Sequence, residues 1–201
     1  MGVARKGELP GMDAEVVAKN RERYDQALAL LDGVRDKVTA VLRAITQDQA
    51  DGRPAENEWS LGEIADHLAI TEREYIAVVA HLAANARPHE FDYRDVAEKR
   101  PYRIEETWDV AVTGRLTTPP NLLPTPGKPL TELLRALQEA RAQSRQTLAP
   151  YRDQDLSVKF FVHPRLGTMT LYERMAQLAY HELKHLKQME RALACLSEAH
   201  R

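Results

Sequence analysis

The 201-residue sequence predicts an all-α domain, a four-helix bundle, on three observations. Aromatic residues make up only 6% of the chain, and the alternation typical of strands is nearly absent. Alanine, leucine, glutamate, arginine and glutamine recur over long stretches, which favours helix. Four segments repeat apolar residues every seven positions, and packing four such faces together is the simplest way to bury them. Because there is no internal repeat, residues 1–201 are expected to form a single domain.

The first helix is expected over residues 13–47. It begins at Asp13, a residue type that commonly caps a helix N-terminus. Gly33 lies inside it and costs about 1 kcal/mol relative to alanine, which weakens the helix without ending it. Its apolar face is formed by residues seven positions apart, namely Val17, Tyr24, Leu31, Val38 and Ile45.

The second helix is expected over residues 60–87. Ser60 and Glu63 form the S-x-x-E capping box that begins a helix, and Pro88 ends it. Residues 49–58 precede it as a connection, against which Trp59 is expected to pack. Its inward-facing residues are Leu61, Ile64, Leu68, Thr71, Tyr75, Val78 and Leu82.

A long crossover, residues 86–129, separates the second helix from the third. It contains most of the prolines and little helical periodicity, and a connection of this length within one domain indicates a crossover or a functional loop. Long loops often carry binding residues. Candidates for a lid over a site are therefore Tyr93, Arg94, Tyr102, Arg103 and Trp108.

The third and fourth helices are expected over residues 131–149 and 170–196. Between them, the sequence KFFVHP at residues 159–164 is expected to form a short extended segment. The residues of the third helix expected to face inward are Leu130, Leu134, Leu137 and Leu148.

Charge and cysteine content exclude several classes of function. The chain has 28 Lys and Arg against 30 Asp and Glu, and this formal net charge of −2, without a basic block, argues against nucleic acid and anionic membranes as partners. No apolar run resembles a signal peptide or spans a bilayer, so a cytoplasmic location is expected. Cys195 is the only cysteine and is expected to be unreactive, so any metal must be bound by histidine and carboxylate.

Polar residues interrupt the apolar face of the fourth helix. His185 shares a register with Leu171 and Leu178, and Glu182 lies between Met175 and Met189, each one heptad away. A buried polar group without a partner costs about 1–3 kcal/mol. These groups must therefore bind something or one another, and Arg174 and Gln188 extend the polar flank.

His181 and His185 stand at positions i and i+4, the spacing at which two imidazoles can ligate one metal ion. Hydrogen bonds to backbone, water or a carboxylate could equally satisfy the pair. His67 lies at the edge of the apolar face of the second helix and can reach across to a facing helix. Three histidines from two helices would leave positions on a metal for water and substrate.

The remaining histidines are weaker candidates. His81 lies two heptads from His67, about 21 Å along the helix at 1.5 Å per residue, too far to share an ion. His89, in the long loop, and His200, near the terminus, are expected to be solvated. His163, before Pro164, could line a pocket mouth.

Residues 181–185 also read H-E-x-x-H, the signature of zincin proteases, in which Glu182 would be the general base. A zincin takes its third ligand downstream of the motif, but no G-x-x-H follows His185. A protease is therefore disfavoured. Glu182 remains a candidate catalytic residue that moves a proton beside a metal, or an acceptor that orients an imidazole.

Two segments resemble the DinB/YfiT-like family. Residues 59–68, W-S-L-G-E-I-A-D-H-L, followed by Glu72, resemble the opening of the second helix in that family. The segment from His163 to Thr170, continuing to His181, His185 and Gln188, looks like its last loop and helix.

The resemblance implies a bundle of up-down-down-up topology, often a homodimer, with one divalent metal held by three histidines. Carried over position by position, the ligands are His67, His181 and His185. Members of the family have been linked to nickel or zinc. Characterised relatives include metal-dependent hydrolase-like proteins and S-transferases that use a low-molecular-weight thiol such as bacillithiol or mycothiol.

We therefore expect a metal-dependent enzyme that acts on a small molecule, either as a hydrolase or by transferring a thiol to an electrophile. A three-histidine site can lower the pKa of bound water to about 7 or hold a thiol as its thiolate. Two alternatives stay open. The bundle could bind a metal or another ligand without catalysis, or the site could be degenerate and empty.

Overall fold

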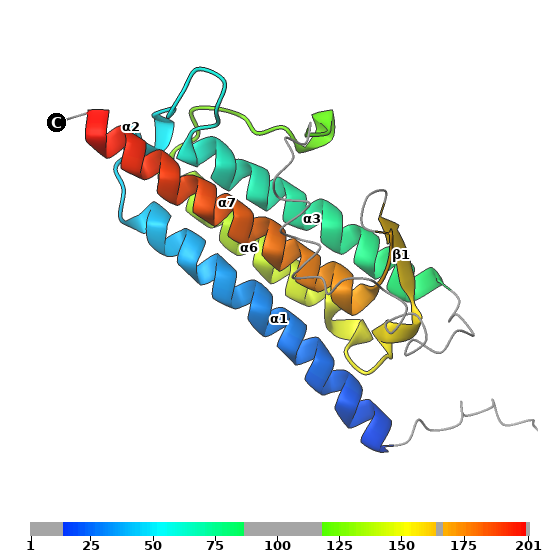
Figure 1. The fold of residues 1–201 in the computed structure, drawn as a ribbon. Coiled ribbons are helices and arrows are strands. Elements are labelled where there is room, and N and C mark those ends of the chain that lie inside the picture. The colour runs from blue at the N-terminus through cyan, green and yellow to red at the C-terminus, as the bar shows by residue number, and fades with distance from the viewer. Residues whose placement is uncertain (1–13, 87–117, 164–166, 200–201) are drawn as a thin grey trace, which may run out of the picture.

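Four long helices lie side by side in the computed structural model, which describes residues 14–86, 118–163 and 167–199 (Figure 1). They are α1 (Ala14–Arg43), α3 (Leu61–Asn85), α6 (Leu130–Leu148) and α7 (Leu171–Ala199). In Figure 1, α1 and α7 run in one direction along the bundle, and α3 and α6 run in the other. The up-down-down-up four-helix bundle predicted from the sequence is therefore confirmed.

The parallel orientation of α3 and α6 explains the long crossover. α3 has 25 residues and so is about 37 Å long, and a chain that continues into a parallel neighbour must return along this whole length. The described part, residues 118–129, contains a short 3₁₀ helix, η1 (Pro120–Leu122). It is fastened to α3 at Asp66, whose carboxylate accepts from the backbone N–H of Thr125 at 2.9 Å and from Lys128 Nζ at 2.8 Å.

The five predicted lid residues lie outside the described part of the chain, as does the predicted N-cap Asp13.

The boundary of the first helix differs from the prediction. α1 ends at Arg43, and a separate short helix, α2 (Gln47–Asp51), occupies part of the predicted connection 49–58. Thr46 begins α2 through a capping box in which its hydroxyl accepts from Gln49 N–H and the Gln49 side chain accepts from Thr46 N–H. This T-x-x-Q pattern favours a new helix start over continuation of α1.

α3 begins at the predicted capping box of Ser60 and Glu63, but its buried face turns along its length. Val78, predicted to face inward, is 36% exposed, whereas Ile76 and Val79 are buried. A straight α-helix drifts by about 20° per heptad relative to a strict seven-residue repeat. The row of residues predicted to face inward at seven-residue spacing therefore leaves the core after two heptads.

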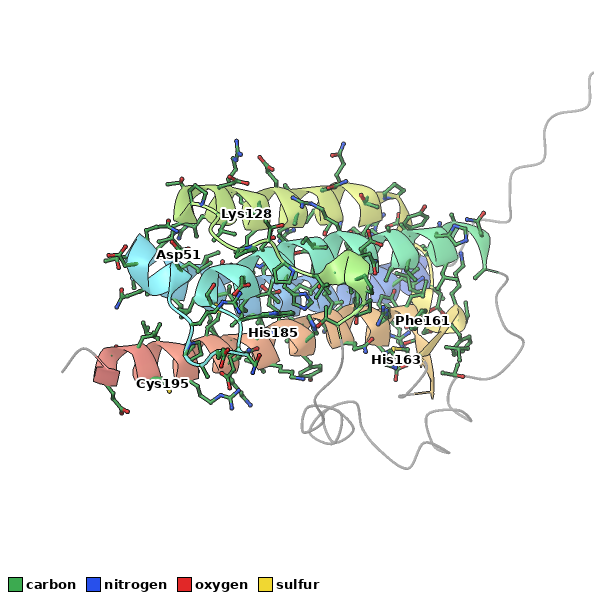
Figure 2. All side chains as sticks on the ribbon, turned by 90° about the horizontal axis from the view of Figure 1, so that it is seen from above. Asp51, Lys128, Phe161, His163, His185 and Cys195 are labelled. Carbon is green, nitrogen blue, oxygen red and sulfur yellow. The ribbon has the colours of Figure 1, made fainter. Side chains whose placement is uncertain are left out.

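The predicted extended segment is one strand of a hairpin. β1 (Phe160–His163) pairs antiparallel with β2 (Gly167–Thr170), so that Phe160 lies opposite Thr170. Two further 3₁₀ turns, η2 (Ala149–Tyr151) and η3 (Leu156–Val158), link α6 to this hairpin. Figure 2 shows the hairpin, with Phe161 and His163, at one end of α7, Cys195 near the other end, and His185 between them.

The apolar core consists of two clusters. One includes Leu31 and Met175, near the hairpin, and the other includes Leu68 and Leu137, near α2. A layer of buried charged residues separates them. None of the helices in the described part of the chain is long and apolar enough to cross a membrane.

Gly33 provides a direct test of the helix energetics. A Cβ built at this exposed position of α1 meets no atom within 4 Å. We expect Gly33→Ala to raise the free energy of unfolding by about 1 kcal/mol, because alanine loses less backbone entropy in a helix than glycine does. Urea unfolding followed by circular dichroism measures the change.

Gly62→Ala is the matched control. The added Cβ would lie 3.2 Å from the Ala50 carbonyl oxygen and 3.3 Å from Leu133 Cδ1, so no such gain is expected there. Equal stabilisation by both substitutions would contradict this account of the two positions.

Candidate metal centre

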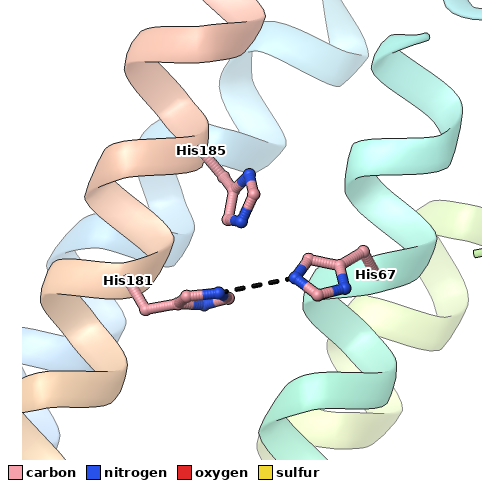
Figure 3. Close-up of side chains that lie close together, drawn as sticks. All are labelled: His67, His181 and His185. Atoms are coloured by element: carbon pink, nitrogen blue, oxygen red, sulfur yellow. Dashed lines mark hydrogen bonds between the residues drawn. The ribbon is translucent and has the colours of Figure 1, made fainter. Parts of the chain in front are cut away.

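Three histidine side chains converge between α3 and α7 (Figure 3). His67 extends from α3, and His181 and His185 extend from successive turns of α7. Each offers a ring nitrogen, and these nitrogens lie within 4.8 Å of one another. The structure thus brings together the three residues selected from the sequence, and in the part of the chain that it describes no other such group of histidine, cysteine and carboxylate side chains occurs.

Hydrogen bonds at the outer nitrogens fix two of the rings. His67 Nδ1 lies 2.8 Å from the backbone oxygen of Leu122, and His185 Nδ1 lies 2.9 Å from Gln188 Oε1. Both partners are acceptors, so each Nδ1 carries the proton and donates it. The Nε2 atom of each neutral ring is then left with a free lone pair, the arrangement found in histidines that ligate metals.

The separation of one pair of these nitrogens matches that of two ligands on one metal ion. His67 Nε2 and His181 Nε2 are 3.4 Å apart, and two nitrogens bound at about 2.0–2.1 Å to one tetrahedral zinc are separated by about 3.3–3.4 Å. The His181 ring contacts the other two imidazoles, and its buried Nδ1 has no hydrogen-bond partner among the described residues. The donor set therefore fits a divalent ion.

Burial keeps all three imidazoles neutral near pH 7. Desolvation lowers the pKa of His185 to about 3 and lowers that of His67, with the Leu122 carbonyl partly opposing the shift at His67. Burial also places the pKa of His181 well below its ordinary value, and the nearby His185 and His67 rings lower it further. Neutral imidazoles need no deprotonation before they bind a metal.

Aromatic rings flank the cluster. The Trp59 ring centroid lies 4.8 Å from that of His67 and 6.2 Å from that of His185, and Tyr75 stacks on His181 at 6.1 Å. For both residues the sequence predicts a packing role only. Trp59 does pack on the core, but it also lines the histidine cluster, a role that its position one residue before the helix cap could have indicated.

The other predicted positions lie apart from the cluster. His81 is exposed on α3 and approaches Asn85, and His163 lies on β1 beside Phe161. Cys195 is exposed near the end of α7. His89 and His200 fall outside the described residues.

Comparison with known proteins identifies the family. The sequence matches the DinB superfamily over residues 14–189, which includes α1, α3, α6, most of α7 and the three histidines. The chain belongs to the DinB superfamily.

Two solved structures resemble this DinB-type bundle. YfiT from Bacillus subtilis, described as a probable metal-dependent hydrolase with an unusual four-helix bundle topology, superposes with a TM-score of 0.55 at 17% identity, over 94% of this chain and 93% of YfiT. TT2238, described as a four-helix bundle protein, gives 0.53 at 21% identity, over 84% and 98% of the two chains. At such identities the likeness shows the fold alone. No curated protein matches the sequence.

Glu182, the candidate catalytic residue, is engaged elsewhere in this DinB-family bundle. Its carboxylate is 1% exposed and is paired with Arg35 Nε and with Arg141 Nη2, the latter at 3.4 Å. Burial raises the pKa of Glu182 even so. The predicted inward position is correct, but the carboxylate points into an arginine pair on α1 and α6, which favours a structural role over proton transfer at the histidines.

Glu72 completes this buried network. It accepts from Arg35 and Arg141 at 2.7 Å each and from Ser144 at 2.8 Å. Burial alone would raise the pKa of Glu72, but the two guanidinium groups outweigh it and hold that pKa below its ordinary value. We define the charged layer as Arg35, Glu72, Arg141 and Glu182, one residue from each long helix.

The zincin interpretation of residues 181–185 is not supported by this geometry. In the cluster the third histidine comes from α3, upstream of the motif, and not from a downstream segment. Glu182, the residue that would be the general base, is held by two arginines.

Gln188→Leu tests whether the amide of Gln188 orients a metal ligand. Without the acceptor for Nδ1–H, the His185 ring loses its fixed tautomer, and we expect zinc affinity to fall about 10- to 100-fold with the helix content unchanged. Competition with a chromophoric chelator measures the affinity. Gln143→Leu, on the exposed face of α6, is the control, and an unchanged affinity in Gln188→Leu would show that this hydrogen bond does not orient the ligand.

Glu182→Gln separates a structural from a catalytic role. Removing one carboxylate from the charged layer leaves buried arginine charge uncompensated, and we expect a loss of about 3 kcal/mol in the free energy of unfolding with metal content preserved. Glu190→Gln, on the exposed face of α7, is the control for urea unfolding. A variant as stable as the wild type that has lost activity would instead assign proton transfer to Glu182.

Proposed function

We propose that this protein is a metal-dependent enzyme of the hydrolase type, with one divalent ion, zinc or nickel, held by His67, His181 and His185. The observation that carries the proposal is the convergence of three neutral imidazoles, two of which are locked by hydrogen bonds at Nδ1 so that Nε2 faces the common centre. Catalytic metal sites combine three protein ligands with open positions in this way. The description of YfiT as a probable metal-dependent hydrolase supports this proposal.

The protein's own groups shape the chemistry in two ways. No carboxylate belongs to the ligand cluster in the described part of the chain, so the full double positive charge of an ion would act on whatever completes its coordination. Trp59 and Tyr75 cover the rings of His67 and His181 and reduce access of bulk water. A bound divalent ion would supply a Lewis acid that polarises a substrate and promotes deprotonation of a nucleophile.

The uncompensated charge also supports a second reaction, transfer of a low-molecular-weight thiol to an electrophilic small molecule. Neutral ligands favour an anionic partner, and a thiol beside such an ion is held as its thiolate. Hydrolysis and thiol transfer therefore use the same centre and differ in the nucleophile that binds there.

We further propose that the protein is a homodimer. Light scattering on the purified protein tests this by measuring its molar mass in solution.

Metal content is the decisive first experiment. We expect protein purified without an affinity tag to contain close to one equivalent of zinc or nickel. His185→Ala should lose the metal, because the two histidines that remain bind an ion only weakly. Hydrolysis of reporter esters and thiol addition to electrophiles should disappear in the same variant. His81→Ala, an exposed histidine on α3, is the matched control and should keep both metal and activity.

Two results would contradict the proposal. Absence of metal in the wild type, even after incubation with zinc and nickel, would exclude a metal-dependent enzyme. Stoichiometric metal that His185→Ala loses, but without turnover of any reporter, would favour the non-catalytic binding bundle.

A further inference from the structure

Arg174 is a buried cation without a counter-ion. Its side chain is 5% exposed on α7, and no carboxylate of the described residues pairs with it. Its Nη1 donates to the amide oxygen of Gln177, a neutral group. Desolvation lowers the pKa of Arg174, and a hydrogen bond with the Tyr75 side chain partly opposes this shift. Among the described residues the other two buried arginines, Arg35 and Arg141, are each paired with both Glu72 and Glu182.

Two aromatic rings set the orientation of this guanidinium. Its central carbon lies 3.6 Å from the ring centroid of Tyr75 on α3 and 4.2 Å from that of Phe161 on β1. Stacking of this kind occupies the flat face of a guanidinium and leaves the N–H groups along its edge for hydrogen bonds. At that edge the buried Nε has no partner among the described residues.

The same Tyr75 ring connects Arg174 to the metal centre. Tyr75 stacks on His181, so one aromatic ring separates the guanidinium from a proposed metal ligand. The charge of Arg174 is also among the causes that lower the pKa of His181. In the described part of the chain the buried side-chain nitrogens without a partner are Arg174 Nε and His181 Nδ1, and they flank this one ring.

We propose that Arg174 is the specificity-determining residue of the metal centre and that it binds a carboxylate of the substrate. This inference rests on the proposed function, since it places the reacting group of the substrate at the metal and its carboxylate one aromatic ring away. A carboxylate is planar and matches the edge of a guanidinium in a bidentate pair, which would satisfy Nε.

A purely structural role does not explain this side chain as well. Arg174 does join the hairpin to α3 through its two rings. However, an unpaired buried charge carries a desolvation cost that an apolar side chain of similar length would avoid. A substrate carboxylate would neutralise Arg174 and offset this desolvation cost in the complex. Substrates without a carboxylate would not, so the site would select for substrates that carry one.

The test uses a pair of probes that differ only in charge. Mercaptohexanoate and mercaptohexanol both carry a thiol that can bind a metal, with a chain long enough to pass one aromatic ring. Binding to the cobalt-substituted protein is followed by the thiolate-to-cobalt charge-transfer absorption, which does not depend on turnover. We expect mercaptohexanoate to bind at least about tenfold more tightly in the wild type, the size of effect typical of a charge-assisted hydrogen bond.

The variants locate the effect. Arg174→Met should bring the ratio of the two affinities to about one, and Arg174→Lys should retain part of it because the charge remains without the bidentate edge. Arg191→Met, at an exposed position on α7, is the matched control and should keep the wild-type ratio.

The outcomes separate this inference from the proposed function. Equal binding of the two thiols by the wild type would overturn the role of Arg174 and leave the metal-dependent enzyme intact, and this comparison needs no variant to fold. A charge preference that survives in Arg174→Met would also overturn it. Failure of the protein to bind cobalt, zinc or nickel would overturn the proposed function and this inference with it.

Discussion

The charged layer of Arg35, Glu72, Arg141 and Glu182 is the constraint on which the rest of the structure depends. It contributes one side chain from each long helix and lies between the two apolar clusters. Apolar contacts alone tolerate sliding of one helix against another by a heptad, because leucine replaces leucine. Here such a slip would place a guanidinium against aliphatic side chains and leave carboxylates unpaired. The layer therefore fixes the axial position of all four helices relative to one another.

The histidine cluster inherits its geometry from this layer. Glu182 lies between His181 and His185 in sequence, but successive residues of a helix point about 100° apart, so the carboxylate faces α1 and α6 while the two imidazoles face α3. On α3, Glu72 similarly enters the layer five residues after His67. The fixed axial position of α3 relative to α7 therefore brings Nε2 of His67 within 3.4 Å of Nε2 of His181.

Much of this arrangement could be predicted from interruptions of the apolar heptads. That signal identified His185 and Glu182, and it was equally present at Arg35 between Leu28 and Leu42 and at Arg141 between Leu134 and Leu148. The partner of each charge could not be predicted, because heptad position gives the face of a helix and not its neighbour. Glu182 was therefore assigned to the metal site instead of to two arginines. The hairpin partner of β1 was missed for a different reason, since four residues of pairing leave little periodicity in the sequence.

The carbonyl of Leu122 has a wider consequence, because it belongs to the crossover that the parallel helices require. The chain must travel back along α3, and on the way it supplies the acceptor that orients a proposed metal ligand. The same segment thus both connects α3 to α6 and helps to build the histidine cluster. Lengthening or shortening the crossover changes the loop-closure entropy little and leaves the helices unchanged, yet it alters the chain that carries the Leu122 carbonyl to His67. A bundle of this topology can diversify the molecules it accepts through a single loop while its core stays constant.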